Sequence, residues 1–198
     1  GIDLLDAGVE DVLRGTGIVN FGTDFVPNGF VNSGYLENVK DIDEDTALSM
    51  GAEVSMSLVA WVWTDEVANP SDIYQVVKGH ILLEYGLALR GGGAGVARFR
   101  YQVRDAAGTL NEAVANTFGA VSAGQWNFVV AIHDAVNNLL KISVNNGAFD
   151  TVAHTTGIRD LTGTFRFNGS AVPSNVPFDG RLDEVALWKR VLSADDLT

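Results

Sequence analysis

The chain has 198 residues, of which 46% are hydrophobic and 19% charged, which is typical of a folded domain and excludes a disordered tail. Its 25 acidic and 13 basic residues give a formal net charge of -12, so nucleic acid and anionic membrane surfaces are unfavourable partners. No apolar run approaches the roughly 20 residues of a membrane span, and the absence of cysteine excludes disulfides and thiolate metal sites.

The N-terminal part of the chain carries the fewest structural signals. Residues 1–33 are rich in Gly, Asp and Asn and favour no particular element. The acidic run Asp41–Asp45 resembles the first half of an EF-hand loop, but Thr46 and Ala52 stand where that loop needs Gly and Glu. We expect a solvated acidic loop here, with weak calcium binding as the alternative.

Alternation of apolar and polar residues, the pattern of a half-buried β-strand, recurs from residue 53 onward. In Glu53–Thr64, five residues share one face: Val54, Met56, Leu58, Ala60 and Val62. The other face ends in Trp61 and Trp63, and a strand that is apolar on both faces belongs inside a sandwich. Further strands are expected at Tyr74–Lys78, Leu82–Arg90, Ala97–Asp105, Trp126–Asp134, Leu139–Asn145, Gly163–Asn168 and Arg181–Arg190. The side chains expected to be buried are Met56, Leu58, Phe128, Val130, Ile142, Val185 and Leu187.

Gly- and Asn-rich turns separate these strands, for example at Gly91–Gly93 and Asn145–Gly147, where residues that tolerate positive φ are needed. One helix start is recognisable, the Ser193–Asp196 capping sequence near the end of the chain, and it leaves room for about a turn and a half. The pattern predicts an all-β protein, a two-sheet antiparallel β-sandwich, with residues 1–198 forming a single domain.

Three segments, in order, carry a resemblance to a known family. They are VSMSLVAWVW at Val54–Trp63, SAGQWNFVV at Ser122–Val130 with LLKISVNNG at Leu139–Gly147, and FDGRLDEVALWKRVLSADDL at Phe178–Leu197. The last resembles the closing f-x-G-x-i-D-e-v-x-i-w-n-r-a-L-s pattern of the laminin-G-like branch of the concanavalin A-like jelly rolls. The resemblance spans residues 34–198, and it implies a jelly-roll sandwich in an extracellular, cell-surface or virion protein with neighbouring domains.

The resemblance also implies a calcium site, because related sandwiches often carry a structural calcium close to the last strand. Asp183 and Asp179 are therefore candidate calcium ligands. The pattern places Asp183 on the same face as Val185 and Leu187. A buried, isolated carboxylate there would cost several kcal/mol unless backbone amides or a cation satisfied it, and both explanations stay open.

Hydrolase chemistry finds little support in the residues. The Glu-x-Asp-x-x-Glu signature of glucanases with this fold is absent, and the adjacent Asp183 and Glu184 would point to opposite faces of a strand. The histidines His80, His133 and His154 are scattered and none stands at a metal-site or triad spacing. We expect no catalytic residues, and for His133 a local hydrogen-bonding role.

Sugars dock by stacking on aromatic rings, so aromatic side chains on strands are the candidate ligand contacts, with packing in the core as the ordinary alternative. The candidates are Trp61, Trp63, Tyr85, Tyr101 and Trp188. The sequence favours a non-catalytic module that binds a glycan or a surface protein. The alternative is a structural domain of a surface layer, fibre or virion, and a glycoside hydrolase is the least favoured reading.

Overall fold

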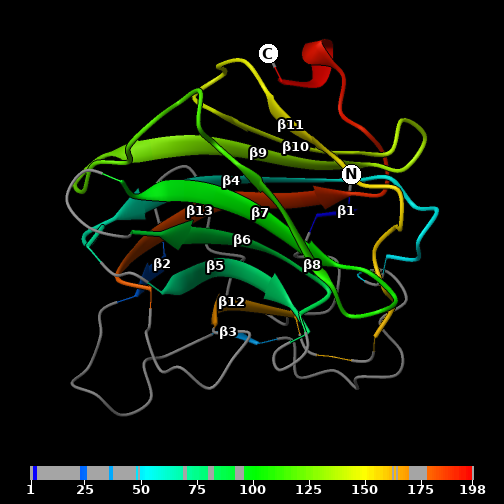
Figure 1. Cartoon of the computed structure of the whole chain (residues 1–198). Coiled ribbons are helices and arrows are strands. Elements are labelled where there is room, and N and C mark those ends of the chain that lie inside the picture. Colours follow the sequence, from blue (N-terminus) through cyan, green and yellow to red (C-terminus); the bar gives the residue numbers. More distant parts are fainter. Residues whose placement is uncertain are drawn as a thin grey trace.

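The computed structural model describes residues 2–3, 23–25, 36–37, 48, 50–68, 71–79, 83–91, 96–161, 163, 165–169 and 178–197. These residues form two packed antiparallel sheets, as the alternation predicted (Figure 1). Sheet A has the order β1 (Ile2–Asp3), β13 (Gly180–Trp188), β4 (Met56–Thr64), β9 (Trp126–Asp134), β10 (Leu139–Val144) and β11 (Asp150–Ala153), with β2 (Thr23–Phe25) also paired to β13. Sheet B has the order β3 (Leu36–Glu37), β12 (Phe165–Gly169), β5 (Asp72–Lys78), β6 (Tyr85–Arg90), β7 (Arg98–Arg104) and β8 (Leu110–Val114).

The sequence-based expectation of an all-β, two-sheet sandwich with almost no helix is confirmed. Within the described ranges, the helix is one four-residue 3₁₀ turn, η2 (Ala194–Leu197), at the predicted capping sequence. The serine hydroxyl of Ser193 accepts a hydrogen bond from the Asp196 amide at 3.3 Å. That residues 1–198 form a single domain stays a prediction.

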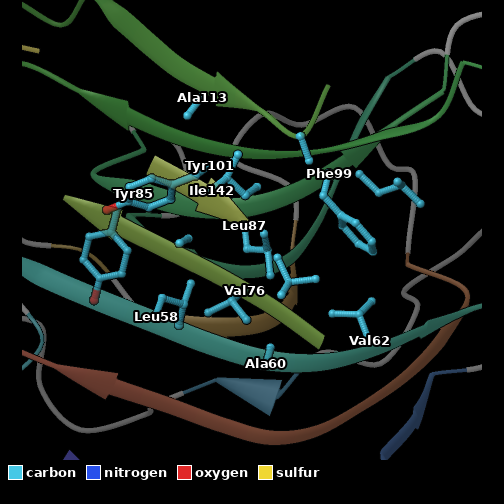
Figure 2. Close-up of a cluster of buried hydrophobic side chains, with 14 of the residues drawn as sticks. Leu58, Ala60, Val62, Val76, Tyr85, Leu87, Phe99, Tyr101, Ala113 and Ile142 are labelled. Atoms are coloured by element: carbon cyan, nitrogen blue, oxygen red, sulfur yellow. The ribbon is translucent and has the colours of Figure 1, made fainter. Parts of the chain in front are cut away.

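The core lies between the two sheets, and each strand contributes alternate side chains to it. Figure 2 shows Leu58 and Ala60 of β4 facing Val76 and Leu87 of sheet B. Met56, Leu58 and Ile142 are at most 1% exposed, as predicted. Burying a Leu or Ile side chain contributes about 1.5–3 kcal/mol, so this layer supplies most of the driving force for folding.

Gly180 fixes the place where β13 begins beside β4. A Cβ atom at this position would lie 2.0 Å from the Trp63 carbonyl oxygen, and φ is 155°. Only glycine permits an approach this close, so the glycine of the Phe178–Leu197 motif sets the register of β13 against β4.

Candidate functional site

Four aromatic rings lie in a group on the face of sheet A that is turned away from sheet B. The aromatic strip consists of Trp61 and Trp63 from β4 and Trp126 and Phe128 from β9. The two strands pair so that Trp61 lies opposite Phe128 and Trp63 lies opposite Trp126. The ring centroids of these pairs are 5.2 Å and 5.9 Å apart, with tilted and edge-to-face geometry. Such pairs are mutually stabilising, and they hold the rings in fixed positions.

The period-2 geometry of the strands explains why these rings face outward. Their neighbours Val62 and Asn127 are both fully buried on the inner face. The outward rings cannot enter the core, so Trp61, Trp63 and Phe128 are half-buried and Trp126 is 36% exposed. Phe128 was expected to be fully buried, and this was wrong because Asn127 occupies the inward position.

Polar groups surround the Trp63 end of the strip. The guanidinium carbon of Arg181 lies 5.5 Å from the centroid of the Trp63 ring, a cation–π arrangement. The Trp63 indole nitrogen donates a hydrogen bond to Asp65 Oδ1 at 2.9 Å. A ring fixed in this way, with a charged group over one side and a carboxylate at its edge, offers both stacking and hydrogen-bonding partners to a ligand.

The residues that follow β13, 189–197, form a C-terminal segment that covers the other end of the same face. Figure 1 shows it on the side of sheet A opposite to sheet B. Leu192 is 6% exposed and packs with Val59, Val130 and Ile132. The hydroxyl of Ser57 donates to the Arg190 carbonyl at 2.8 Å and accepts from the Leu192 amide at 3.0 Å. Among the described residues of this face, the aromatic strip holds the most exposed aromatic ring, that of Trp126.

Of the predicted ligand-contacting residues, Trp61 and Trp63 lie in the strip. Trp188 is also on the outer face, but it packs partly buried against the cluster under the C-terminal segment. Tyr85 and Tyr101 are 0% exposed, and Figure 2 shows both rings between the sheets, so neither can stack on a sugar. The sequence contains the reason: each tyrosine alternates with inward apolar residues, Leu87 on β6 and Val103 on β7. Trp126 was missed as a ligand contact, although the strand that it begins, Trp126–Asp134, was predicted.

The predicted burial of Asp183 is also wrong, because β13 contains a bulge. The register with β4 shifts between Asp183 and Ala186, and Glu184 adopts a φ of 46°. The extra residue turns Asp183 to the outer face, where it is half-exposed and lies opposite Trp61, while Leu187 is fully buried and Val185 only partly so. Asp183 Oδ1 accepts a hydrogen bond from the Glu184 amide at 2.8 Å.

Calcium binding by Asp183 and Asp179 stays a prediction. The carbonyl oxygen of Asp179 accepts a hydrogen bond from the Asp65 amide at 2.9 Å. Among the described residues, no three His, Asp or Glu side chains are grouped as metal ligands. A calcium ion here would need backbone oxygens and water to complete its six to eight ligands. The acidic run Asp41–Asp45 lies outside the described residues.

Two histidines lie together in the interior at one end of the sandwich. The rings of His133 and His154 are 5.4 Å apart, both side chains are buried, and His133 Nδ1 lies 2.9 Å from the Val54 carbonyl oxygen. Burial lowers the pKa of both imidazoles. This agrees with the expected local hydrogen-bonding role of His133. His80 lies outside the described residues.

Glu84 has the raised pKa that a general acid needs, but not the access. Burial raises its pKa to about 7. The side chain is 0% exposed, accepts a hydrogen bond from the Met50 amide at 2.7 Å and lies 3.9 Å from Lys78 Nζ. A substrate cannot reach a carboxyl group in this position, so its environment is structural.

The comparisons agree with this fold. The Limulus polyphemus SAP-like pentraxin aligns with a TM-score of 0.62 at 12% identity, covering 86% of this chain and 76% of the pentraxin. A Ruminococcus gnavus sialidase CBM40, solved with α2,3 sialyllactose, gives 0.57 at 16%, covering 89% of this chain and 90% of that chain. Domain 4 of a Geobacillus stearothermophilus extracellular arabinanase, solved with arabinotriose, gives 0.55 at 15%, covering 76% and 66%. No curated protein matches the sequence.

Within the described residues, no helix has the length and apolar character that a membrane crossing needs.

A laminin G family model matches residues 41–198 of the chain. The family is described as the concanavalin A-like lectin/glucanases superfamily. That match covers most of the chain and includes all three segments on which the resemblance rested. The chain therefore belongs to the laminin-G-like family of the concanavalin A-like lectin/glucanase superfamily.

Proposed function

We propose that this chain is a non-catalytic carbohydrate-binding module of a larger extracellular or surface protein, and that it binds sugar on the aromatic strip. The observation that carries the proposal is the grouping of Trp61, Trp63, Trp126 and Phe128 on one outer sheet face. The apolar face of a sugar ring stacks on such rings, and the fixed geometry of the strip reduces the entropy lost on binding.

Two further observations support binding over other roles. Two structures with the same fold were solved with sugars, arabinotriose in one and α2,3 sialyllactose in the other. The carboxyl group with the raised pKa, Glu84, is enclosed in the core, whereas a glycosidase needs a protonated carboxyl beside its substrate. We therefore expect the protein to bind oligosaccharides and to release no reducing sugar from them.

The test is a glycan array probed with this protein, followed by calorimetric titration of the strongest-binding oligosaccharide. Trp126→Ala should weaken binding at least tenfold because it removes the most exposed ring of the strip. Trp126→Phe, which keeps a ring, should retain most of the affinity. Leu110→Ala is the matched control, because Leu110 is 38% exposed, much like Trp126, but lies on the edge strand of sheet B.

Two results would contradict the proposal. Unchanged affinity in Trp126→Ala, with a melting temperature equal to that of the wild type, would place the sugar elsewhere. If no glycan on the array bound, the structural role in a surface layer, fibre or virion would be favoured instead.

A further inference from the structure

The outer face of sheet B carries a network of charged and polar side chains that crosses four strands. Asp72 of β5 forms a bidentate ion pair with Arg90 of β6, with its Oδ1 2.6 Å from Arg90 Nε. On β7, Gln102 Nε2 donates to Asp72 Oδ2 at 3.2 Å and to Glu112 Oε2 of β8 at 3.0 Å. Glu112 in turn pairs with Arg100 at 2.6 Å. Because every member is held by another, the side chains are fixed before any ligand arrives.

Positive charge is in excess at one end of this network. Arg98 lies directly opposite Arg90 in the β6–β7 register, and like charges in that arrangement are destabilising. Within the described part of the chain, Arg98 has no carboxylate partner, and its Nη1 donates only to the Ala97 carbonyl at 3.1 Å. Arg100 Nε is buried and has no hydrogen-bond partner. Three guanidinium groups thus share two carboxylates, Asp72 and Glu112.

This excess contrasts with the charge of the whole molecule. The chain has 13 basic residues against 25 acidic ones, yet four of the basic residues lie on the outer face of β6 and β7. They are Arg90, Arg98, Arg100 and Arg104. The alternate residues of β7, Phe99, Tyr101 and Val103, are fully buried, so the arginines face outward. A long polyanion is repelled by a net charge of -12, so the cluster suits a ligand with a single, localised negative charge.

The polar groups beside the arginines are buried and hold the network together, and the guanidinium groups themselves indicate what carries the ligand's charge. The Tyr74 hydroxyl donates to Gln102 Oε1, and the Tyr74 ring lies over Gly86, where a Cβ atom would approach the ring to 2.8 Å. Gln102 is 0% exposed, and its amide oxygen and nitrogen are bonded to Tyr74, Asp72 and Glu112, so it holds the network in place and does not contact a ligand. Guanidinium groups bind a carboxylate in a bidentate manner.

We propose that Arg90, Arg98 and Arg100 form a second binding site, separate from the aromatic strip, for the carboxylate of an acidic sugar. The sugar part of this assignment rests on the proposed function of the chain, whereas the anion site rests on the arginine cluster alone. A sialic acid and a uronic acid both supply the required chemistry, a carboxylate attached to a hydroxylated ring.

The experiment compares α2,3 sialyllactose, lactose and trigalacturonate as probes, by calorimetry and by amide chemical-shift perturbation. We expect the acidic probes to bind at least tenfold more tightly than lactose and to shift the β6 and β7 amides. Whichever acidic probe binds identifies the source of the carboxylate. Equal binding of all three probes, or acidic binding without β6 and β7 shifts, would overturn the second site.

Arg98→Gln is the decisive variant, because Arg98 has no ion pair to lose and the fold should survive its replacement. It should weaken acidic probes about tenfold, leave lactose unchanged and leave the melting temperature within a degree or two. Arg104→Gln is the matched control, because it makes the same change of charge on the same strand and the same face. Arg104 lies six residues from Arg98 on β7, roughly 20 Å away at about 3.4 Å per residue. An equal loss in both variants would mean that overall charge, and not a site, attracts the probe.

The two proposals fail separately. If Arg98→Gln has no effect while Trp126→Ala abolishes binding, the second site is wrong and the aromatic strip stands. If Arg98→Gln abolishes acidic binding while Trp126→Ala has no effect, the aromatic strip is wrong and the anion site stands.

Discussion

Two buried ionisable side chains, Glu84 and Lys78, affect how the stability of this protein depends on pH. Glu84 and Lys78 are both at most 1% exposed and form an ion pair between the end of β5 and the residue before β6. Lys78 Nζ also lies 2.5 Å from the Gly163 carbonyl oxygen. Taking two charges out of water costs several kcal/mol per ion, and their attraction offsets this only in part. The pair therefore makes stability depend on pH.

We predict that the free energy of unfolding of the wild type falls as pH rises, and that Glu84→Gln abolishes this fall. The pKa of Glu84 is about 7 in the folded protein and near its ordinary value of 4.5 when unfolded. Between these values the folded state binds more protons, so the free energy of unfolding falls as pH increases from about 4.5 to 7 and is lowest above that range. The full effect is about 3 kcal/mol, at roughly 1.36 kcal/mol per pKa unit.

The measurement is urea unfolding of wild type and Glu84→Gln at intervals between pH 5 and 8. The comparison concerns the slope against pH, because the variant also leaves Lys78 without its counter-ion at every pH. The buried imidazoles of His133 and His154 act in the opposite direction, reducing stability as pH falls below their ordinary pKa of 6.5, and they do so equally in both proteins. Parallel pH profiles for the two proteins would show that Glu84 does not titrate as described.

At the level of elements, the predictable strands are those whose alternation is strong. Trp126–Asp134 was predicted with the observed bounds, Leu139–Asn145 ends one residue after β10, and Glu53–Thr64 begins three residues before β4. These segments combine alternation with many apolar residues, which makes them recognisable as strands. β8 and β11 were missed because they are short edge strands whose residues, LNEAV and DTVA, are half-buried or exposed apart from Ala113. Edge strands have few buried positions, so their sequences carry little of the pattern.

The candidate site was less predictable than the fold. On β4 and β9 both faces are apolar, so the period alone cannot decide which face is inward, and the inward Asn127 reverses the usual preference. The bulge at Glu184 arises from the pairing of β13 with β4, and the residues of β13 contain no glycine or turn signal at that position that would predict it. The arginine network was not recognised because its members come from four strands whose register a sequence does not contain.

The C-terminal segment behaves as part of sheet A, and we predict that Leu192→Ala lowers the free energy of unfolding by about 2–4 kcal/mol. Leu192 is 6% exposed among Val59, Val130 and Ile132, so shortening it leaves a cavity on the outer face. Val136→Ala is the control, because Val136 is 83% exposed in the β9–β10 turn and should change stability by less than about 0.5 kcal/mol. A loss below 1 kcal/mol in Leu192→Ala would show that the segment is not packed on the sheet in solution.

At the scale of the whole molecule, the net charge of -12 favours cations in general, so a specific calcium effect must be separated from charge screening. We predict that millimolar calcium raises the melting temperature relative to excess chelator, through an ion bound near Asp183 and Asp179. A ligand that binds only the folded state contributes about 2.7 kcal/mol at a hundredfold excess over Kd.

Two controls isolate the site. Magnesium at the same concentration reports the general effect of a divalent cation, and Asp183→Asn should abolish the calcium-specific part. Identical melting of the wild type in calcium and in chelator would mean that the hydrogen bond from the Glu184 amide satisfies Asp183 without a metal.

The strand order of sheet A also has a consequence for the synthesis of the protein. β4, the first long strand among the described residues, pairs on one side with β9 and on the other with β13, which is synthesised after all the other described strands. Until residues 180–188 emerge, one edge of β4 has no partner, and β4 is among the most apolar strands of the protein. An open apolar edge can pair with another nascent chain. Chains that terminate before β13 should therefore accumulate as aggregates, and chaperones that shield strand edges should matter most before residues 180–188 have emerged.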